Sequence, residues 1–289
     1  MHCVKAKGIL SSKNGINIYR GCVHGCIYCD SRSACYRMSH DFEDIEVKEN
    51  AVELLESALK RKRKKCMIGT GSMTDPYIPL EREFEFMRKV LALIERYGFG
   101  FTLITKSDLV LRDIDLLQAI NKKTKCVVQM TLTTYDESLC KKLEPNVCTT
   151  HRRFEVLKEL HRLGIPTVVW LCPILPFIND TKENLEGILN YCIEAKVYGI
   201  ICFGMGLTLR EGNREYFFKK LDKLYPTLKI KYLKEYGKNY FITSKRNSEL
   251  MNIFHEMCEA NGIIHNNEEI FKYLNTFETK ENPVQLDLW

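Results

Sequence analysis

The chain has 289 residues, of which 45% are hydrophobic and 28% are charged, and its formal net charge is +6. These values exclude a disordered or fibrous protein and allow either two average domains or one α/β barrel. No apolar stretch approaches the roughly 20 residues of a membrane-spanning helix, and the N-terminus lacks the layout of a signal peptide. We therefore expect a cytoplasmic protein without a membrane partner, in which the 13 cysteines are free thiols or metal ligands.

Short apolar runs alternate with segments of helical periodicity over the first 224 residues, which is typical of βα units around a parallel sheet. Strands are expected at residues 16–19, 66–70, 101–105, 126–132, 167–172 and 200–203. Helices are expected at 50–62, 81–97, 112–120, 151–163, 182–196 and 213–224, with Gly164 as the stop of the helix before it. The pattern predicts an α/β fold, a partial (β/α)6 TIM-like barrel whose active-site groups gather at the strand C-terminal ends.

From residue 225 the pattern changes to two more helical stretches, a short apolar run at 239–243 and a polar tail. We predict a core domain at 1–224, an α-rich C-terminal extension at 225–277 packed on the core, and a flexible tail at 278–289. A run of six cations, from Lys60 to Lys65, could face a nucleic acid. The simpler interpretation is a solvated helix end, where cations also suit the helix dipole.

Three cysteines, Cys22, Cys26 and Cys29, follow the first expected strand in the sequence RGCVHGCIYCD. With Gly21 and Gly25 allowing a tight wrap of the backbone, their thiolates can converge on one 4Fe-4S cluster. Three thiolates leave one of the four irons open to a further ligand. The alternative is a zinc site with His24 or His40 as fourth ligand, although no second CxxC or CxxH pair accompanies the motif.

The other cysteines show no such grouping, and we interpret Cys35 as a bystander. Four of them lie in expected strands, where a free cysteine behaves as a small core hydrophobe, namely Cys66, Cys126, Cys172 and Cys202. A second cluster is therefore not expected.

The motif C-x3-C-x-aromatic-C, with Tyr28 before the last cysteine, resembles the signature of the radical S-adenosylmethionine (SAM) superfamily. The resemblance implies that SAM binds the open iron and is cleaved by one electron to methionine and a 5′-deoxyadenosyl radical. That radical would remove a hydrogen atom from a substrate. The resemblance also implies an external one-electron reductant of the flavodoxin or ferredoxin type.

Further segments extend the likeness, namely GTGSMTDPYIPLE, TKSDLVLRDIDLL, TLTTYDESLCKKLEPN with THRRFEVLKELHRLGIP, and CPILPFIND. Together they resemble the branch that contains spore photoproduct lyase and DNA repair photolyase-related proteins, which implies DNA as the substrate. The resemblance places a Tyr28 backbone group against the adenine of SAM. It places four residues near the SAM methionine and ribose, namely Thr74, Lys106, Thr131 and Arg153. For these four, a surface cation or a threonine in a turn is the alternative, and Asp75 and Glu144 are equally open to a capping role.

One departure concerns the hydrogen donor. Spore photoproduct lyase has a hydrogen-returning cysteine just after the second strand, where this chain has Ser72. Because an O–H bond is a poorer hydrogen-atom donor than S–H, either another donor serves or the reaction differs, and no catalytic residue is assigned. Radical modification of RNA, a peptide or a small metabolite stays open. A zinc-stabilised nucleic-acid-binding protein is the alternative from another class.

The chain ends in Gln285, Leu286, Asp287, Leu288 and Trp289. This sequence resembles the short peptides that dock on the DNA sliding clamp, in which two apolar side chains fill a pocket and a glutamine anchors the backbone. A tail that folds back on the barrel mouth or on a dimer partner is the alternative.

Overall fold

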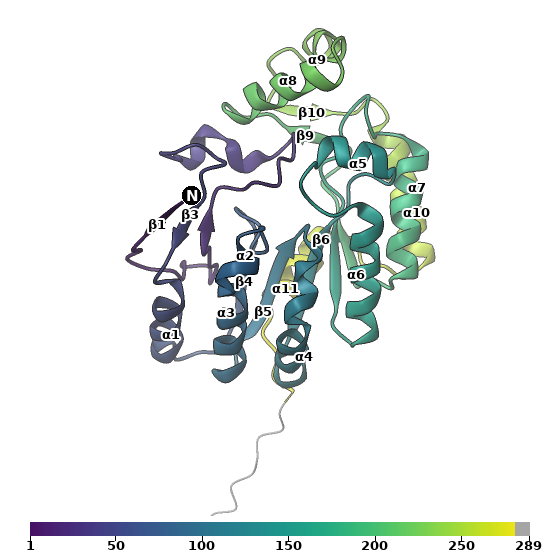
Figure 1. The fold of residues 1–289 in the computed structure, drawn as a ribbon. Helices are drawn as coiled ribbons and strands as arrows, with labels where there is room; N and C mark the ends of the chain where they lie inside the picture. The colour runs from purple at the N-terminus through teal and green to yellow at the C-terminus, as the bar shows by residue number, and fades with distance from the viewer. Residues whose placement is uncertain (281–289) are drawn as a thin grey trace, which may run out of the picture.

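The computed structural model describes residues 1–280 and is centred on a parallel sheet of five strands in the order β4-β5-β6-β7-β8. The strands are β4 (Met67–Thr70), β5 (Gly100–Thr105), β6 (Cys126–Thr131), β7 (Thr167–Trp170) and β8 (Gly199–Ile201). Neighbouring strands are consecutive in the chain, so their C-terminal ends meet at one edge of the sheet (Figure 1). The predicted α/β fold, a partial barrel of βα units, is confirmed.

Helices cover the outer face of this sheet (Figure 1). They are α1 (Ala51–Arg61), α3 (Phe86–Arg96), α4 (Ile114–Lys123), α6 (Thr150–Arg162) and α7 (Lys182–Glu194). Helix α6 shows why they form: Leu157 and Leu160 are spaced to face the core together, and they join the same buried cluster as Val128 of β6. The predicted stop at Gly164 is confirmed, because this glycine follows α6 with a φ of 73°.

The first predicted strand, 16–19, differs in the structure. Gly15 makes one parallel bridge to Gly69 of β4, and the Ile16 amide donates to the Gly69 carbonyl at 2.8 Å. The chain then leaves β4, because Tyr19 becomes buried by pairing with Val47. This pairing builds a separate sheet in the order β1-β3-β2 from β1 (His2–Val4), β2 (Tyr19–Arg20) and β3 (Glu46–Lys48).

The predicted helix 81–97 is interrupted. It consists of α2 (Glu81–Phe84) and α3, separated by Glu85 with a φ of 50°. The break has a physical cause, because the buried Glu81 carboxylate accepts the Met87 amide at 2.7 Å and so caps the start of α3. Two further elements stand between strands, the 3-10 helix η3 (Asp108–Asp113) before α4 and α5 (Glu137–Leu143) after β6.

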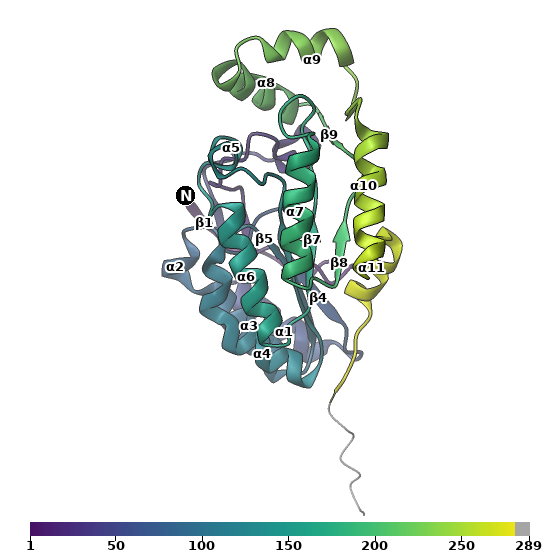
Figure 2. The ribbon, with the colours of Figure 1, turned by 90° about the vertical axis from the view of Figure 1, so that its right-hand side faces the viewer.

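The C-terminal part begins after β8 with β9 (Gly206–Thr208), α8 (Asn213–Leu224), α9 (Leu228–Tyr236) and β10 (Phe241–Thr243). Strands β9 and β10 pair antiparallel, and α8 and α9 lie beyond the strand ends (Figure 2). The predicted boundary at 224/225 falls between α8 and α9, whose Phe217 and Tyr232 rings are 5.5 Å apart. That division of the chain stays a prediction.

Two more helices, α10 (Asn247–Ala260) and α11 (Asn267–Asn275), complete the described chain. Helix α11 packs Ile270 and Leu274 on Val127 and Val168, whose side chains face away from Val128 and the outer helices.

The start of the predicted tail is held against the core, since the Lys280 amide donates to the Lys123 carbonyl at 2.9 Å. Residues 285–289 lie outside the described residues. Among the described helices, none combines the length and the apolar character needed to cross a membrane.

Candidate active site

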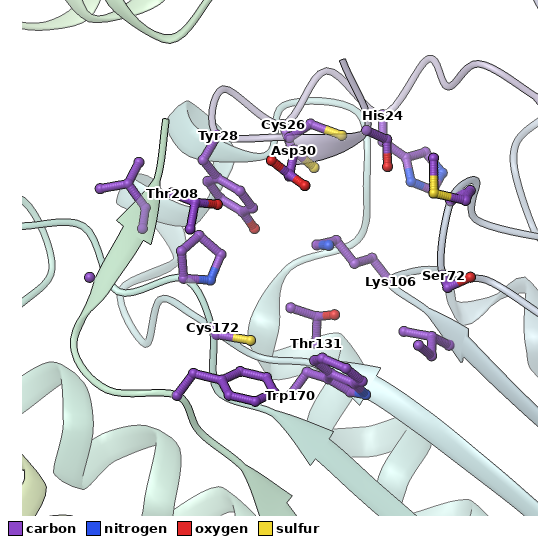
Figure 3. A pocket seen from close by; sticks show the side chains of 18 of the residues that line it. His24, Cys26, Tyr28, Asp30, Ser72, Lys106, Thr131, Trp170, Cys172 and Thr208 are labelled. Carbon is purple, nitrogen blue, oxygen red and sulfur yellow. The ribbon is translucent and has the colours of Figure 1, made fainter. Parts of the chain in front are cut away.

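A cavity of about 660 Å³ opens at the edge where the C-terminal ends of the parallel strands meet (Figure 3). The cysteine loop that follows β2, the ends of β4 to β7, and the segment from Phe203 to β10 contribute to its wall. Of the predicted site residues, Cys22, Cys26, Cys29, Tyr28, Lys106 and Thr131 line it. Thr74 and Arg153 are buried and do not line it, although the neighbours of Thr74 on both sides do.

The cysteine loop is held by its backbone from two sides. On one side the Cys22 amide donates to the Phe42 carbonyl at 3.0 Å. Gly21 has a φ of 92°, and a Cβ built on it would lie 2.5 Å from that carbonyl oxygen. The glycine is therefore required for this close approach, as its place before the motif led us to expect.

On the other side, the end of α5 and the segment that follows it are hydrogen-bonded to the loop. The Ile27 amide donates to the Leu143 carbonyl at 3.0 Å, and the Asn146 amide donates to the His24 carbonyl at 3.1 Å. The Asn146 side chain also donates to the Val23 carbonyl at 2.8 Å. The three cysteines are thus presented by a loop whose own shape is fixed.

The three thiols form no disulfide. Burial raises the pKa of Cys22 to about 12 and raises that of Cys26 well above its usual value. Buried thiols of this kind become thiolates only when a strong positive charge lies beside them, and bound iron supplies that charge. Three thiols on one short, fixed loop that line one cavity fit the ligand set of a 4Fe-4S cluster.

Of the two histidines considered as zinc ligands, His24 lines the cavity and His40 does not. His24 is buried beside Asp75, and the distance from its Nδ1 to the Asp75 carboxylate is 3.6 Å. Burial lowers the pKa of His24, although Asp75 opposes that effect. His40 lies near Glu46, 3.9 Å from its carboxylate, and not in the cavity wall.

Asp75 joins three parts of the site. Its carboxylate accepts the Thr105 hydroxyl and the Lys106 amide, both at 2.7 Å, and the Tyr77 amide at 2.9 Å. With His24 on its other side, Asp75 fixes the end of β5 relative to the cysteine loop. The sequence left its role open, and the structure gives it this positioning role.

Lys106 extends from the end of β5 toward Tyr28 and Cys26 (Figure 3). Its ammonium lies 5.8 Å from the centre of the Tyr28 ring, and among residues 1–280 its Nζ has no hydrogen-bond partner. Burial opposes the charge on Lys106, whereas Cys26 and Glu144 favour it, and the net effect raises its pKa. A charged ammonium without a hydrogen-bond partner therefore lies inside the cavity, beside the cysteines.

Arg153 has a different place from the one predicted. It is fully buried and forms an ion pair with Glu144, which also accepts the Tyr28 hydroxyl. The same guanidinium donates to the Thr131 carbonyl at 2.9 Å and to the Cys148 carbonyl at 2.8 Å. Arg153 is thus committed to protein partners behind the cavity wall, where it holds Tyr28 through Glu144.

Sequence reasoning missed the aromatic part of the wall. Trp170 is the last residue of β7, and its ring centre is 6.2 Å from that of Phe203. Phe203 is 64% exposed and Phe241 is 70% exposed, and both line the cavity. Their only signal in the sequence is an aromatic residue within each of two short apolar runs, 200–203 and 239–243, which does not reveal that both residues line one cavity.

Cys172 also needs a correction. We expected it inside a strand as a core residue, but β7 ends at Trp170 and Cys172 lines the cavity. Figure 3 shows its sulfur on the side of the cavity that Trp170 and Thr131 also occupy. The cavity therefore contains a thiol outside the cysteine motif.

Comparison with known proteins agrees with these features. Residues 16–192 match the family model described as the radical SAM superfamily. An uncharacterised protein of Mycobacterium tuberculosis is 27% identical over 233 residues, which cover 78% of this chain and 68% of the relative. An uncharacterised protein of Methanocaldococcus jannaschii is 34% identical over 176 residues, 60% of this chain and 65% of the relative.

Among solved structures, spore photoproduct lyase complexed with dinucleoside spore photoproduct superimposes with a TM-score of 0.61. The match covers 88% of this chain and 76% of the lyase at 15% sequence identity, so it shows a shared fold. The family match decides between an enzyme and a zinc-stabilised binding module in favour of the enzyme. This chain belongs to the radical SAM superfamily, whose enzymes use a 4Fe-4S cluster, SAM and an external reductant.

Proposed function

We propose that this chain binds its cluster through Cys22, Cys26 and Cys29, cleaves SAM reductively, and acts by radical chemistry on a base of a nucleic acid, in the manner of spore photoproduct lyase. The observation that carries the substrate class is the pair of exposed phenylalanines, Phe203 and Phe241, in the wall of the cavity that also holds the cysteine loop. When bound, the cluster and SAM supply a one-electron cleavage that yields a primary carbon radical.

The cofactor end of the cavity is assigned to the polar residues. Lys106, which has a charged ammonium and no hydrogen-bond partner within residues 1–280, binds the SAM carboxylate by a charge-assisted hydrogen bond. Tyr28 offers its backbone to the adenine, and Thr131 and Thr74 remain the proposed hydroxyl partners. Arg153 acts as a positioning residue, because its partners are Glu144 and main-chain carbonyls.

The substrate end is assigned to the aromatic residues. A side chain that is 70% exposed, such as Phe241, leaves apolar surface in water unless a ligand covers it. Bases stack on aromatic rings whatever their sequence, because every base has a flat π face. The basic run 60–65 does not contribute, since it precedes β4 and so lies at the opposite edge of the sheet from the cavity.

Cys172 is the proposed hydrogen donor in place of the missing lyase cysteine. A product radical would take the hydrogen atom from its S–H bond and leave a sulfur-centred radical. One electron from a flavodoxin- or ferredoxin-type reductant and one proton then restore the thiol. Burial raises the pKa of Cys172 to about 12, so the S–H form is the one present at neutral pH.

The test uses the cluster-loaded enzyme under anaerobic conditions with SAM, a chemical reductant and a deuterated probe. Three probes are compared: single-stranded DNA, RNA and a peptide, each deuterated at its carbon positions. We expect deuterium in 5′-deoxyadenosine with DNA, measured by mass spectrometry. Deuterium transfer from the peptide alone would contradict a nucleic-acid substrate, and transfer from RNA alone would replace DNA by RNA.

A further inference from the structure

A second group of metal-ligand side chains lies outside the cavity, near the start of the chain. His2 of β1 and His40 and Asp44 of the loop before β3 each place one ligand atom within 4.8 Å of the other two. His2 Nδ1 lies 2.9 Å from Asp44 Oδ2, and the rings of His2 and His40 meet edge to face with centres 4.8 Å apart. None of these residues lines the cavity, and the proposed radical chemistry does not use them.

The imidazole of His40 is the informative member of this group. Its Nδ1 lies 3.0 Å from the Asp41 carbonyl oxygen, which can only accept a hydrogen bond, so Nδ1 carries the proton. In a neutral ring Nε2 then has a free lone pair. That Nε2 is buried and has no hydrogen-bond partner among the described residues.

Protonation would not solve this problem, because the nearby Glu46 carboxylate is 3.9 Å from Nε2, too far for a hydrogen bond. A buried lone pair without a donor is unfavourable, and it calls for a missing partner. A ring that donates one N–H to a carbonyl while its other nitrogen stays free is the arrangement of metal-binding histidines.

We propose that His2, His40 and Asp44 bind a divalent transition metal ion, Zn²⁺, and that Glu46, which lies outside this group of three but 3.9 Å from His40 Nε2, moves in as the fourth ligand. At Zn–N and Zn–O distances of about 2.0–2.2 Å, ligand atoms of a tetrahedral site lie roughly 3.3–3.6 Å apart. The distances of 2.9 Å between His2 and Asp44 and 3.9 Å between His40 and Glu46 bracket this value. Two carboxylates would balance the charge of the ion.

The ligand set separates this site from the cysteine loop. It offers nitrogen and oxygen but no sulfur, a set that suits Zn²⁺ and is unsuited to an iron–sulfur cluster. The other oxygen of Asp44 is bonded to the amino group of Met1 at 2.8 Å, which leaves Oδ2 for the ion.

The ion would support the active site without entering it. Phe42 lies between His40 and Asp44, and its carbonyl accepts the Cys22 amide at 3.0 Å. The Phe42 ring also lies under the Arg32 guanidinium, at 4.2 Å. An ion that joins residues 40–44 to β1 would therefore fix the backbone contact behind Cys22.

Equilibrium dialysis of the cluster-loaded full chain against micromolar Zn²⁺ tests the site. The protein must carry no histidine tag and no extension before Met1. Metal analysis should find one zinc per chain in addition to the cluster iron. His40→Gln should weaken zinc binding at least tenfold, and Asp44→Asn, a change at a half-exposed residue, should do the same if His40→Gln misfolds. His161→Gln, at an exposed position on α6, is the matched control and should bind normally.

Two readouts keep the outcome clear. X-ray absorption at the zinc edge should show only nitrogen and oxygen ligands, and zinc should raise the unfolding temperature of the wild type but not of His40→Gln. Sulfur ligation, equal zinc affinity in wild type, His40→Gln and Asp44→Asn, or no bound zinc would each overturn the proposal. Because SAM cleavage is not the readout, these results do not depend on the proposed function.

Discussion

The two ends of the cavity are built differently. At the cofactor end, the cysteine loop is bonded to Phe42, Leu143 and Asn146, and Asp75 fixes the neighbouring Lys106. At the substrate end, Phe203 and Phe241 are largely exposed and belong to segments joined by the short ribbon of β9 and β10. The difference teaches that hydrogen bonds within the protein already fix the polar end, whereas the aromatic end leaves apolar surface exposed, which the proposed nucleic-acid base would cover.

The largest effect is expected from the cofactor end. Cys26→Ala removes one sulfur from the fixed loop, so the cluster loses a ligand, and we expect loss of bound iron and no detectable reductive cleavage of SAM. Iron analysis and quantification of 5′-deoxyadenosine measure both. Cys35→Ala is the control, since this exposed cysteine is outside the cavity wall and should change neither quantity. Wild-type cleavage by Cys26→Ala would refute the ligand assignment.

The buried ion pair between Arg153 and Glu144 lies behind the cofactor end and should contribute strongly to the stability of the protein. Arg153→Met leaves Glu144 as an unpaired buried charge, and such a loss destabilises a protein by about 3–5 kcal/mol. Arg152→Met is the matched neighbour, because its ion pair with Asp108 is half exposed and should contribute about 1 kcal/mol or less. Urea unfolding measures both changes in free energy. Equal losses of unfolding free energy in the two variants would show that the ion pair between Arg153 and Glu144 does not stabilise the cofactor end more than a surface ion pair does.

Lys106 tests whether the cofactor end recognises SAM by charge. Lys106→Met keeps most of the side-chain length but removes the ammonium. A hydrogen bond to a charged group contributes about 1.5–3 kcal/mol, so SAM should bind about ten to a hundred times more weakly. Calorimetric titration of SAM measures this, with Lys122→Met on the surface of α4 as control. An unchanged dissociation constant would remove Lys106 from the site.

The aromatic end should show a smaller effect on a different ligand. Phe241→Ala removes one stacking surface, and base stacking contributes about 1–3 kcal/mol per base. Binding of a fluorescent single-stranded oligonucleotide should weaken accordingly. Ile230→Ala removes an equally exposed apolar side chain, at 69% exposure, that does not line the cavity, and should have no effect. If both variants bind alike, the phenylalanines are not a base platform.

The last residues should matter least to the cavity. Deletion of 285–289 should leave the rate of SAM cleavage unchanged and should abolish binding to a DNA sliding clamp, if that binding exists in the full chain. Surface plasmon resonance with immobilised clamp measures the affinity. Equal affinity of the truncated and full chains would dismiss the clamp peptide.

Features that depend on residues close together in the chain could be predicted from the sequence, and features that depend on distant residues could not. The cysteine motif is local, so its spacing alone predicted the loop that lines the cavity. The family resemblance named Lys106 and Thr131, and their places near the ends of expected parallel strands, which must meet, supported that prediction. The commitment of Arg153 to Glu144 depends on the direction in which α6 presents a side chain to the segment before it, which the spacing did not reveal.

The aromatic end was not predictable for the same reason. Phe203 and Phe241 line one cavity because β9, which follows Phe203, pairs with β10, which contains Phe241, although α8 and α9 separate these strands in the chain. The first predicted strand failed because burial of Tyr19 and Val47 in a separate sheet outweighed a local strand pattern.

The pairing of β9 with β10 has a consequence for protein engineering. The chain leaves the barrel through β9 and returns to it through β10, and these two strands are neighbours. The segment with α8 and α9 therefore begins and ends at adjacent points. Replacing the segment between those two points would exchange α8 and α9, and with them the surroundings of Phe241. The cysteines and Lys106 would keep their places in the chain. An engineered chain would thus keep the cysteine loop and present a different surface beside Phe241.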